Sequence, residues 1–381
     1  MRKFIVITGT RAEYGIFKPV LKAINERIDV ELSLIAIGMH LLKDFGYTIN
    51  EIEKDGFKIS AKIEGLYSKD SGADMAKSIG KGIVKLTEVL DKAKPDILLL
   101  LGDRGEMLAG AIAATYMSIP IAHIHGGEVS GNVDGVVRHA ITKLAHIHFP
   151  ATEESANRII KMGEAPSRVY VVGAPSLDSI LKEDIIEPTE LSKKYDLDLS
   201  KPILLVIHHP VILEFDNAPS QIRETLEAIS ELKYQTILVY PNADAGGRRM
   251  IEVIKEYEKS PFIKTIESIP YREFLSLMNI ANAMVGNSSS GIIEAPSFGL
   301  PVVNIGSRQD GRQRSTNVID VGYNRKGIKA AIKKALYDED FKRKAKECKN
   351  PYGNGKASIR IADILSKIKI DKELLQKRFT W

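Results

Sequence analysis

The sequence predicts an α/β protein built from two doubly wound domains that face each other. Short apolar runs that resemble buried strands alternate with longer segments of helical period, which is the pattern of a parallel sheet covered by helices on both faces. At 381 residues the chain is long for a single core, and a charged, turn-rich stretch over 176–200 separates two such series. We therefore expect a first domain over 1–175, a second over 176–360, and a C-terminal helix over 361–381 that packs back on the first domain.

In the first domain the expected strands are short and almost wholly apolar, as strands buried on both faces are. They cover residues 4–8, 30–37, 97–101, 121–125, 147–149 and 169–172. The clearest helices between them cover residues 16–26, 80–92 and 106–116. The strands of the second domain are expected at residues 203–207, 236–240, 263–266, 283–285 and 302–305. From residue 357 onward the apolar positions follow helical spacing, which predicts one or two amphipathic helices.

Composition excludes several classes of protein. The single cysteine, Cys348, is incompatible with a disulfide framework or a four-thiolate metal site, so we expect a reducing, cytoplasmic compartment. No stretch approaches the roughly 18–20 apolar residues of a membrane span. The net charge of +5 is mild, and the lysines lie at helical spacing or in the tail. We therefore expect neither a membrane nor a nucleic acid as partner.

Polar residues and glycines follow nearly every expected strand. In open parallel sheets ligands bind beyond the carboxyl ends of the strands, so these segments should be considered together. Glycine allows a sharp turn and a close approach of a ligand to the backbone. The segments are 9–14, 38–40, 102–104, 125–128, 208–210, 241–244, 286–291 and 306–308. Their positions predict a binding site in the cleft between the two domains.

Residues 123–143 form the most polar of these regions, with three imidazoles, two carboxylates, one guanidinium and one ammonium group around four glycines. Asp103 and Glu128 end consecutive strands, and Asp134 is expected to begin a helix. Crowded acids raise the pKa of at least one of them, which suits a general acid or base. Two structural roles remain open, an N-cap for Asp134 and an ion pair with Arg104 for Asp103. A metal site at His123 and His125 is disfavoured because no cysteine is near, so no metal is expected.

The run 287–291, Asn-Ser-Ser-Ser-Gly, precedes a helix expected to run through residues 293–298. Amides and hydroxyls at a helix start suit a phosphate, although simple capping by serine is the alternative. Glu294 lies one turn further on, where it could bind ribose hydroxyls, and Arg308 adds charge for a diphosphate. The chain lacks both Gly-x-Gly-x-x-Gly after its first strand and a Walker lysine, which argues against an NAD enzyme or a P-loop NTPase.

Taken together, these motifs resemble the UDP-N-acetylglucosamine 2-epimerase family, and more narrowly its hydrolysing branch, which feeds sialic-acid and legionaminic-acid synthesis. The motifs occur in family order from residue 7 to about residue 320: Gly-Thr-Arg-Ala-Glu-Tyr, Gly-Met-His-Leu-Leu, Gly-Asp-Arg, His-Ile-His-Gly-Gly-Glu, His-His-Pro, Pro-Asn-Ala-Asp and Gly-Asn-Ser-Ser-Ser-Gly. The resemblance implies the glycosyltransferase-B fold, with the nucleotide held by the second domain and the sugar in the interdomain cleft. It also implies a homodimer or homotetramer and no cofactor.

The resemblance further implies a reaction in two halves. A base removes the proton on sugar C2 while the nucleotide diphosphate leaves C1, and water then adds to the 2-acetamidoglucal with inversion at C2. Residue roles carry over by position. Asp103 and Asp134 match acid–base carboxylates, and His209 matches a contact to the diphosphate and C1. The matching binding positions are Arg11, Ser288 and Ser289 for the diphosphate, Glu294 for the ribose, His40 for the sugar pocket, and Arg138, Asn242 and Arg308 for the substrate.

His125 departs from the family pattern, because many relatives have glutamate there and that glutamate is assigned to catalysis. We expect His125 to take the proton-transfer role with Glu128 assisting, since an imidazole suits proton transfer near neutral pH. Glu128 as the base is the alternative. The motifs do not separate UDP from GDP, nor a plain sugar from one with a C4 acetamido group. The competing functions are a non-hydrolysing epimerase, a glycosyltransferase of the same fold and a nucleotide-sugar sensor.

Overall fold

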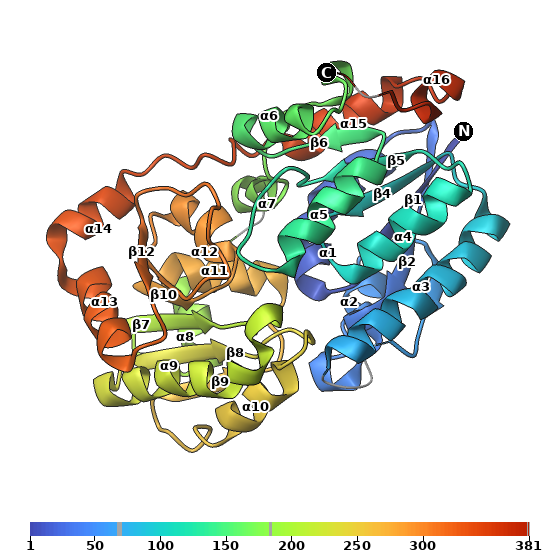
Figure 1. Ribbon diagram of the computed structural model, residues 1–381. Coiled ribbons are helices and arrows are strands. Elements are labelled where there is room, and N and C mark those ends of the chain that lie inside the picture. Colours follow the sequence, from blue (N-terminus) through green and yellow to red (C-terminus); the bar gives the residue numbers. More distant parts are fainter. Residues whose placement is uncertain (67–70, 183–184, 379, 381) are drawn as a thin grey trace.

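Two six-stranded parallel sheets, each flanked by helices, form the molecule (Figure 1). A computed structural model describes residues 1–66, 71–182, 185–378 and 380. The strand orders are β3-β2-β1-β4-β5-β6 and β12-β11-β10-β7-β8-β9. In both sheets the order reverses direction beside the first strand in the sequence, as it does in doubly wound folds. The predicted α/β fold class is therefore confirmed.

The first sheet contains β1 (Arg2–Thr8), β2 (Val30–Ile37), β3 (Ile59–Ile63), β4 (Ile97–Leu101), β5 (Ile121–Ile124) and β6 (Ile147–Phe149). Its inner strands are apolar because helices cover both faces. The accompanying helices and 3₁₀ turns are α1 (Arg11–Asn25), η1 (Gly38–Leu41), η2 (Lys43–Phe45), α2 (Ile49–Lys54), α3 (Gly72–Ala93), α4 (Gly105–Tyr116), α5 (Val133–Leu144), α6 (Glu153–Lys161), η3 (Pro166–Arg168) and α7 (Ser176–Lys182).

The second sheet contains β7 (Ile203–Ile207), β8 (Gln235–Val239), β9 (Ile263–Ile266), β10 (Ala283–Gly286), β11 (Val302–Ile305) and β12 (Val318–Val321). Its helices and 3₁₀ turns are α8 (Pro188–Tyr195), η4 (Ile212–Asn217), α9 (Ala218–Leu232), α10 (Gly247–Lys255), α11 (Tyr271–Ile280), α12 (Ser290–Ile293), η5 (Ala295–Phe298), α13 (Arg325–Tyr337) and α14 (Glu339–Lys346). The chain then returns to the first sheet as α15 (Ala357–Lys367) and α16 (Lys372–Leu375).

The strand expected over residues 169–172 is wrong. This segment makes only an isolated bridge, between Val169 and His148. Val172 does donate its N–H to the carbonyl of Pro150, but proline has no N–H with which to continue the ladder. The strands β3 and β12 were not expected. Both lie at sheet edges and mix polar with apolar residues, so they lack the continuous apolar pattern of the inner strands.

Helix α1 begins five residues earlier than expected. Thr10 caps it, and the Thr10 hydroxyl accepts a hydrogen bond from the N–H of Glu13 at 3.2 Å. Much of the segment 9–14, which the sequence suggested as a loop after β1, is therefore the first turn of a helix, with Arg11 at its first position. This places Arg11 at the carboxyl end of the first sheet.

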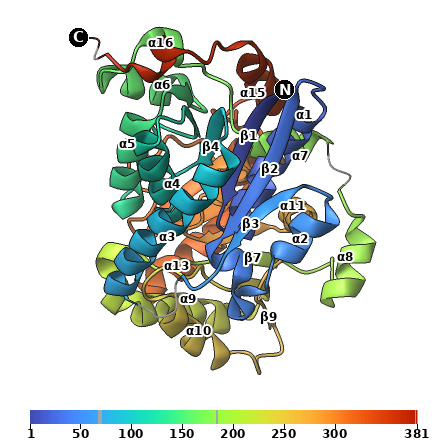
Figure 2. The same ribbon diagram turned by 90° about the vertical axis from the view of Figure 1, so that its right-hand side faces the viewer.

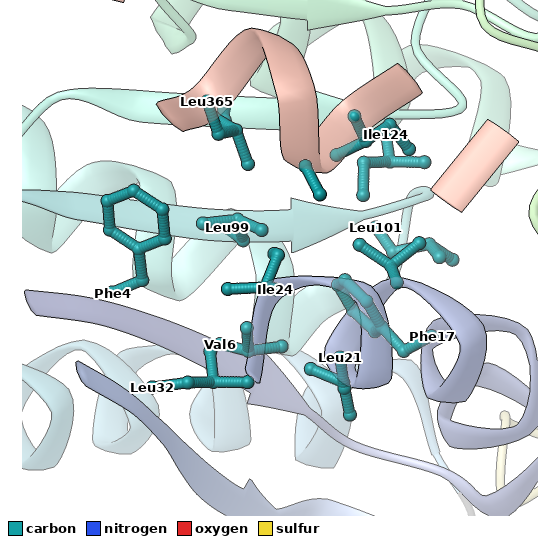
Figure 3. Packing of buried hydrophobic residues seen from close by; sticks show 14 of the residues in the cluster. Phe4, Val6, Phe17, Leu21, Ile24, Leu32, Leu99, Leu101, Ile124 and Leu365 are labelled. Carbon is teal, nitrogen blue, oxygen red and sulfur yellow. The ribbon is translucent and has the colours of Figure 1, made fainter. Parts of the chain in front are cut away.

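Figure 3 shows the core between α1 and the first sheet, together with Leu365 from α15. Phe17 and Leu21 of α1 pack against the sheet. These two side chains and that of Leu365 are fully buried. Burial of one such side chain contributes about 1.5–3 kcal/mol. Figure 2 shows α15 beside α1 and the N-terminus. The C-terminal helix expected over 361–381 is thus two shorter helices, and Phe379 and Trp381 lie outside the described residues.

The chain passes between the two halves at two places that touch each other. The N–H of Ala174 donates to the carbonyl of Tyr352 at 2.7 Å. Beside it, a Cβ built on Gly353 would lie only 3.0 Å from the Cα of Gly173, and the φ angles of these glycines are +118° and +91°. Only glycine adopts such angles without strain and permits so close a backbone approach. The two segments that connect the halves therefore lie in direct backbone contact with each other.

A buried carboxylate fastens the C-terminal tail to the first half. Glu164 lies 2.5 Å from Lys143, 3.0 Å from His148 and 2.8 Å from Lys377. Burial acts to raise the pKa of Glu164, but the hydrogen bonds from His148, Lys143 and Lys377 outweigh it and lower that pKa to about 2. Since this value lies below the ordinary 4.5, the stabilisation is complete above about pH 4.5 and is lost as the pH falls toward 2.

We expect Glu164→Gln to lower the free energy of unfolding by about 2–3 kcal/mol at pH 7, because the partly buried ammonium groups of Lys143 and Lys377 lose their carboxylate partner. Denaturant unfolding of both proteins between pH 7 and pH 3 measures the difference. It should shrink below about pH 4.5, because Glu164 then takes up a proton in the unfolded wild type while the native carboxylate, with its pKa of about 2, still resists protonation. A difference that stays constant over this range would show that the ion pairs do not stabilise the tail.

Candidate active site

A cavity of about 250 Å³ lies where the carboxyl ends of the two sheets face each other. Both halves of the chain contribute to its walls. The predicted site residues that line it are Arg11, Asp103, His125, Glu128, Arg138, His209, Asn242, Ser288, Ser289, Glu294 and Arg308. Side chains chosen from strand ends more than 200 residues apart therefore do surround one space. The strand-end argument located the cavity itself.

His40 does not line this cavity. Its side chain has no exposed surface, and its two ring nitrogens lie 3.0 Å from the Thr8 hydroxyl and 2.8 Å from the Thr48 hydroxyl. Burial, then the charge of Arg11, lowers the pKa of His40 to about 3, so the ring is neutral. The neighbouring Met39 faces the cavity instead. His40 thus supports the wall from behind.

Asp134 lies beside the cavity without lining it. It is the second residue of α5, and Asn132, not Asp134, occupies the N-cap position. One carboxylate oxygen is 3.5 Å from Arg308 and accepts a hydrogen bond from the Asn132 amide at 3.3 Å. Burial and then the charge of Asp103 raise the pKa of Asp134 to about 6. This is a value from which a carboxyl group can exchange protons near neutral pH.

His125 occupies a turn with a backbone conformation that few residues adopt. Its φ angle is +62°, in the left-handed region, where histidine is tolerated better than most residues other than glycine. Its N–H donates to the carbonyl of Phe149 at 3.1 Å, and its carbonyl accepts from Arg138 at 2.8 Å. The Nδ1 atom lies 2.5 Å from a carboxylate oxygen of Glu128. These contacts hold the imidazole at the cavity wall, as expected of a strained functional residue.

Glu128 is buried among cationic groups. Its second carboxylate oxygen lies 2.8 Å from Arg312 and 3.6 Å from Arg138. Burial acts to raise the pKa of Glu128, but the charge of Arg312, together with the contacts that the carboxylate makes with His125 and Arg138, outweighs burial and holds that pKa well below its ordinary value. Glu128 is therefore ionised, which allows it to accept a hydrogen bond from His125 but not to donate one.

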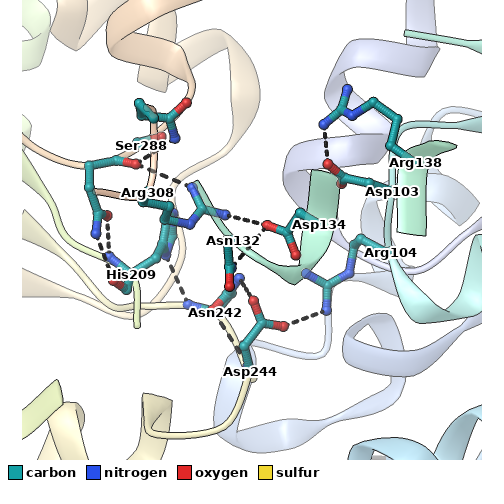
Figure 4. A network of polar contacts seen from close by, with 12 residues as sticks. Asp103, Arg104, Asn132, Asp134, Arg138, His209, Asn242, Asp244, Ser288 and Arg308 are labelled. Atoms are coloured by element: carbon teal, nitrogen blue, oxygen red, sulfur yellow. Dashed lines mark hydrogen bonds and ion pairs between the residues drawn. The ribbon is translucent and has the colours of Figure 1, made fainter. Parts of the chain in front are cut away.

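Arg138 joins the catalytic candidates to one another. From α5 it donates to the carbonyl of His125 and to a carboxylate oxygen of Asp103, and Figure 4 shows the second contact. The alternative ion pair between Asp103 and Arg104 is not what the structure contains. Arg104 instead lies 3.3 Å from Asp244 and 3.5 Å from Glu106. Asp103 is thus free of Arg104 and faces the cavity.

Besides the contact between Glu128 and Arg312, two further ion pairs cross between the halves beside these groups. Arg308 reaches Asp134, and Arg104 reaches Asp244 (Figure 4). The N–H of Gly131 also donates to the carbonyl of Arg308 at 3.2 Å. The turn after β5 and the loop after β11 therefore touch each other at the rim of the cavity.

His209 presents a defined tautomer to the cavity. The backbone N–H of Asn242 donates to its Nδ1 at 3.2 Å, so Nδ1 must carry a lone pair. Burial and then the charge of Arg308 lower the pKa of His209 well below its ordinary value, which keeps the ring neutral. The proton of a neutral ring then resides on Nε2. Asn287 fixes the backbone of His209 through two further hydrogen bonds of 2.7 and 2.8 Å.

The helix expected over 293–298 is interrupted. The four-residue α12 is followed by the 3₁₀ turn η5, because Pro296 lacks the N–H that an α-helix would use at that position. Ser288 and Ser289 still line the cavity, but no long helix dipole stands behind them. Glu294 is 2% exposed, and burial raises its pKa above the ordinary value.

The cavity has charged residues that the sequence analysis did not identify, among them Arg312 and Glu13. Arg312 lines the cavity four residues after Arg308, and the recurrence of arginine after the same strand was the available signal. Glu13 also lines it and accepts a hydrogen bond from the N–H of Gly9 at 3.2 Å. Burial and then Glu106 raise the pKa of Glu13 to about 8. Nothing in the first-strand motif distinguishes this glutamate from a solvent-exposed one.

Across the described parts of the chain, there is no group of three or more histidine, cysteine, aspartate or glutamate side chains arranged to hold a metal ion. The same residues contain no helix that is both long and apolar enough to cross a membrane.

Comparison with known proteins finds that this chain is similar to nucleotide-sugar 2-epimerases. Residues 22–366 match the family described as UDP-N-acetylglucosamine 2-epimerase. The chain is 44% identical, over 99% of both sequences, to UDP-N,N'-diacetylbacillosamine 2-epimerase (hydrolyzing) of Legionella pneumophila. It is 34% identical to a UDP-N-acetylglucosamine 2-epimerase of Neisseria meningitidis, over 100% of this chain and 99% of that protein. The solved structure of S. aureus MnaA with UDP shares the fold, with a TM-score of 0.80, 24% identity and 96% of each chain covered.

Proposed function

Because the chain belongs to the UDP-N-acetylglucosamine 2-epimerase family, we propose that it is a hydrolysing 2-epimerase. It would convert a UDP-linked 2-acetamido sugar and water into the free C2-epimeric sugar and UDP. The single observation that carries the proposal is that the two halves of the chain place complementary groups around one cavity. An acid–base cluster from the first half faces cationic, amide and hydroxyl groups from the second. The reaction needs proton transfer at C2 and stabilisation of a leaving diphosphate at C1.

In the first half-reaction, His125 removes the proton from C2, and the C1–O bond to the diphosphate breaks. A double bond forms between C1 and C2, giving a 2-acetamidoglucal, and UDP takes up the electron pair of the broken bond. Arg308, Ser288 and the Nε2–H of His209 stabilise the charge on the leaving diphosphate. Arg11 and Glu294 complete the nucleotide site, and Asn242 and Arg138 contribute further substrate contacts.

In the second half-reaction, water adds across the double bond. Its hydroxyl joins C1, and a proton reaches C2 on the face opposite to the one that lost it. Of Asp103 and Asp134, one gives a proton to C2 and the other takes the proton that the attacking water loses, and His125 releases the C2 proton to solvent. The raised pKa of Asp134 suits it to carry a proton near neutral pH. The sum of the two steps consumes one water and releases the epimerised sugar and UDP.

We propose UDP-N,N'-diacetylbacillosamine as the preferred substrate, since the relative with that activity shares 44% of its residues with this chain, against 34% for the Neisseria meningitidis protein. The test is a side-by-side assay of this compound, its GDP-linked analogue and UDP-N-acetylglucosamine, with products separated by chromatography. We expect the highest kcat/KM for the UDP-linked diacetyl sugar. A higher value for UDP-N-acetylglucosamine would overturn the choice of sugar. A higher value for the GDP-linked analogue would overturn the choice of uridine as the nucleoside.

Arg308→Ala should weaken UDP binding about 10–100-fold and change kcat less, because one charge-assisted contact contributes about 1.5–3 kcal/mol. Titration calorimetry with UDP measures the change. Arg314→Ala is the matched control, since Arg314 lies in the same loop but pairs with Asp320. Ser288→Ala should cost only a few-fold, as expected for a neutral hydrogen bond. Unchanged UDP affinity in Arg308→Ala would remove Arg308 from the diphosphate site.

We also propose that the protein is cytoplasmic and works as a homodimer or homotetramer, in keeping with its family and its single cysteine. Light scattering on the purified chain distinguishes these states. A monomer at working concentration would overturn this part of the proposal.

A further inference from the structure

A buried ion pair connects the His125 turn to the loop that follows β11. Glu128 and Arg312 are separated by 2.8 Å, and their side chains are only 3% and 5% exposed. Glu128 belongs to the first half and Arg312 to the second, so this pair crosses the cavity wall between them. A buried pair of this kind interacts far more strongly than one at the surface.

Glu128 in turn touches the imidazole of His125 through its other oxygen. An ionised carboxylate only accepts hydrogen bonds, so Nδ1 of His125 must then carry the ring proton. Nε2 is left with a lone pair and can take a proton from a substrate. A protonated Glu128 could instead donate to Nδ1, and the neutral ring would then carry its proton on Nε2, where it cannot act as a base.

We propose that Arg312 is a positioning residue that keeps Glu128 in the carboxylate form and thereby selects the His125 tautomer able to accept the C2 proton. The proposal rests on the proposed function, because it assigns the base role to His125. Arg312 acts through Glu128 and does not itself move the proton. The second half of the molecule thus contributes to the acid–base chemistry of the first.

The other groups around Glu128 do not replace Arg312. Arg138 is further away, at 3.6 Å, and already donates to Asp103 and to the carbonyl of His125. Tyr352 lies nearby as a neutral phenol, since burial and then the charge of Glu128 raise its pKa. Asp103 and Asp134 add negative charge that acts on Arg312. Removing Arg312 therefore leaves a buried carboxylate in a region with two further acids.

The experiment compares Arg312→Met with Arg312→Lys. In Arg312→Met the pKa of Glu128 rises, so the acidic limb of kcat/KM should move to higher pH. The rate should fall at least about tenfold at pH 7 and recover as the pH increases. Arg312→Lys keeps the charge and should restore most of the wild-type profile. Arg343→Met is the control for loss of an arginine outside the cavity, since Arg343 pairs with Asp340 on the surface, and its profile should match that of the wild type.

A purely structural role for Arg312 predicts a different outcome. In that case Arg312→Met would lower the melting temperature and reduce the rate equally at every pH, with the acidic limb unmoved. This result would overturn the proposal. Equal loss in Arg312→Lys and Arg312→Met would also overturn it, because the charge would then be irrelevant.

A second measurement does not require turnover. Nitrogen-15 NMR of histidine-labelled protein at pH 7, with His125→Asn used for assignment, reports which ring nitrogen of His125 is protonated. We expect protonated Nδ1 in the wild type and protonated Nε2 in Arg312→Met. The same tautomer in both proteins would contradict the inference even if the enzyme were active. If the wild type lacks turnover but the tautomer of His125 still differs between the wild type and Arg312→Met, only the proposed function is contradicted.

Discussion

Asp103→Asn is expected to reduce kcat by about 10²–10⁴-fold while changing UDP affinity by no more than a few-fold. Asp103 faces the cavity at the end of β4, next to the His125 turn. The substitution replaces its ionisable carboxylate with a neutral amide. Asparagine has nearly the same shape and can still contact Arg138. Steady-state kinetics and UDP titration on the same preparation measure the two quantities.

Asp178→Asn provides the control for lost folding in the Asp103 experiment. Asp178 is fully buried, does not line the cavity, and accepts hydrogen bonds from the N–H groups of Ala357 and Ser358 at the start of α15. Its variant should lose stability but keep kcat per folded molecule. If UDP affinity in Asp103→Asn fell as much as the rate did, Asp103 would be a structural residue.

His125→Asn should cause a loss of similar size, about 10²–10⁴-fold in kcat. Asparagine suits this test because it tolerates the left-handed φ of +62° that His125 adopts, so the turn is expected to keep its shape. An amide side chain has no basic nitrogen to accept the C2 proton. The measurement is kcat at saturating substrate, with thermal unfolding as the check that the turn has survived.

The His125 experiment also decides between the two candidate bases. If His125→Asn retained more than about a tenth of the wild-type kcat, proton abstraction would belong to Glu128. His125→Glu adds a second test, because the family resemblance predicts glutamate at this position. Retained activity would indicate that one position performs proton transfer with either side chain.

The parts of the fold that could be predicted are those in which one physical requirement dominates the sequence. The inner strands are buried on both faces, so β4 and β7 appear as continuous apolar runs, and β1 contains one over residues 4–7. The edge strands β3 and β12 contain exposed or polar positions and have no such pattern. Residues 169–172 resemble a strand in the sequence, but their pairing with the neighbouring segment stops at Pro150. A local sequence pattern does not reveal that partner.

The site divides in the same way. Residues that follow buried strands, such as Asp103 and His209, could be placed at one rim by topology alone. Contacts that depend on side-chain direction could not. His40 follows a strand but points into the core, toward Thr8 and Thr48. The pairing of Glu128 with Arg312 joins residues 184 positions apart, in loops that follow strands of different sheets, so only the folded structure brings it into view.

The most direct test of the hydrolysing 2-epimerase is the reaction in deuterated water, followed by NMR and mass spectrometry of all products. Hydrolysis through C2 deprotonation predicts free, epimerised sugar with one deuterium at C2, together with UDP in equal amount. A mixture of nucleotide-linked epimers without free sugar would contradict hydrolysis. Free sugar without deuterium at C2 would contradict the proton transfer for which His125, Glu128 and Asp103 are arranged.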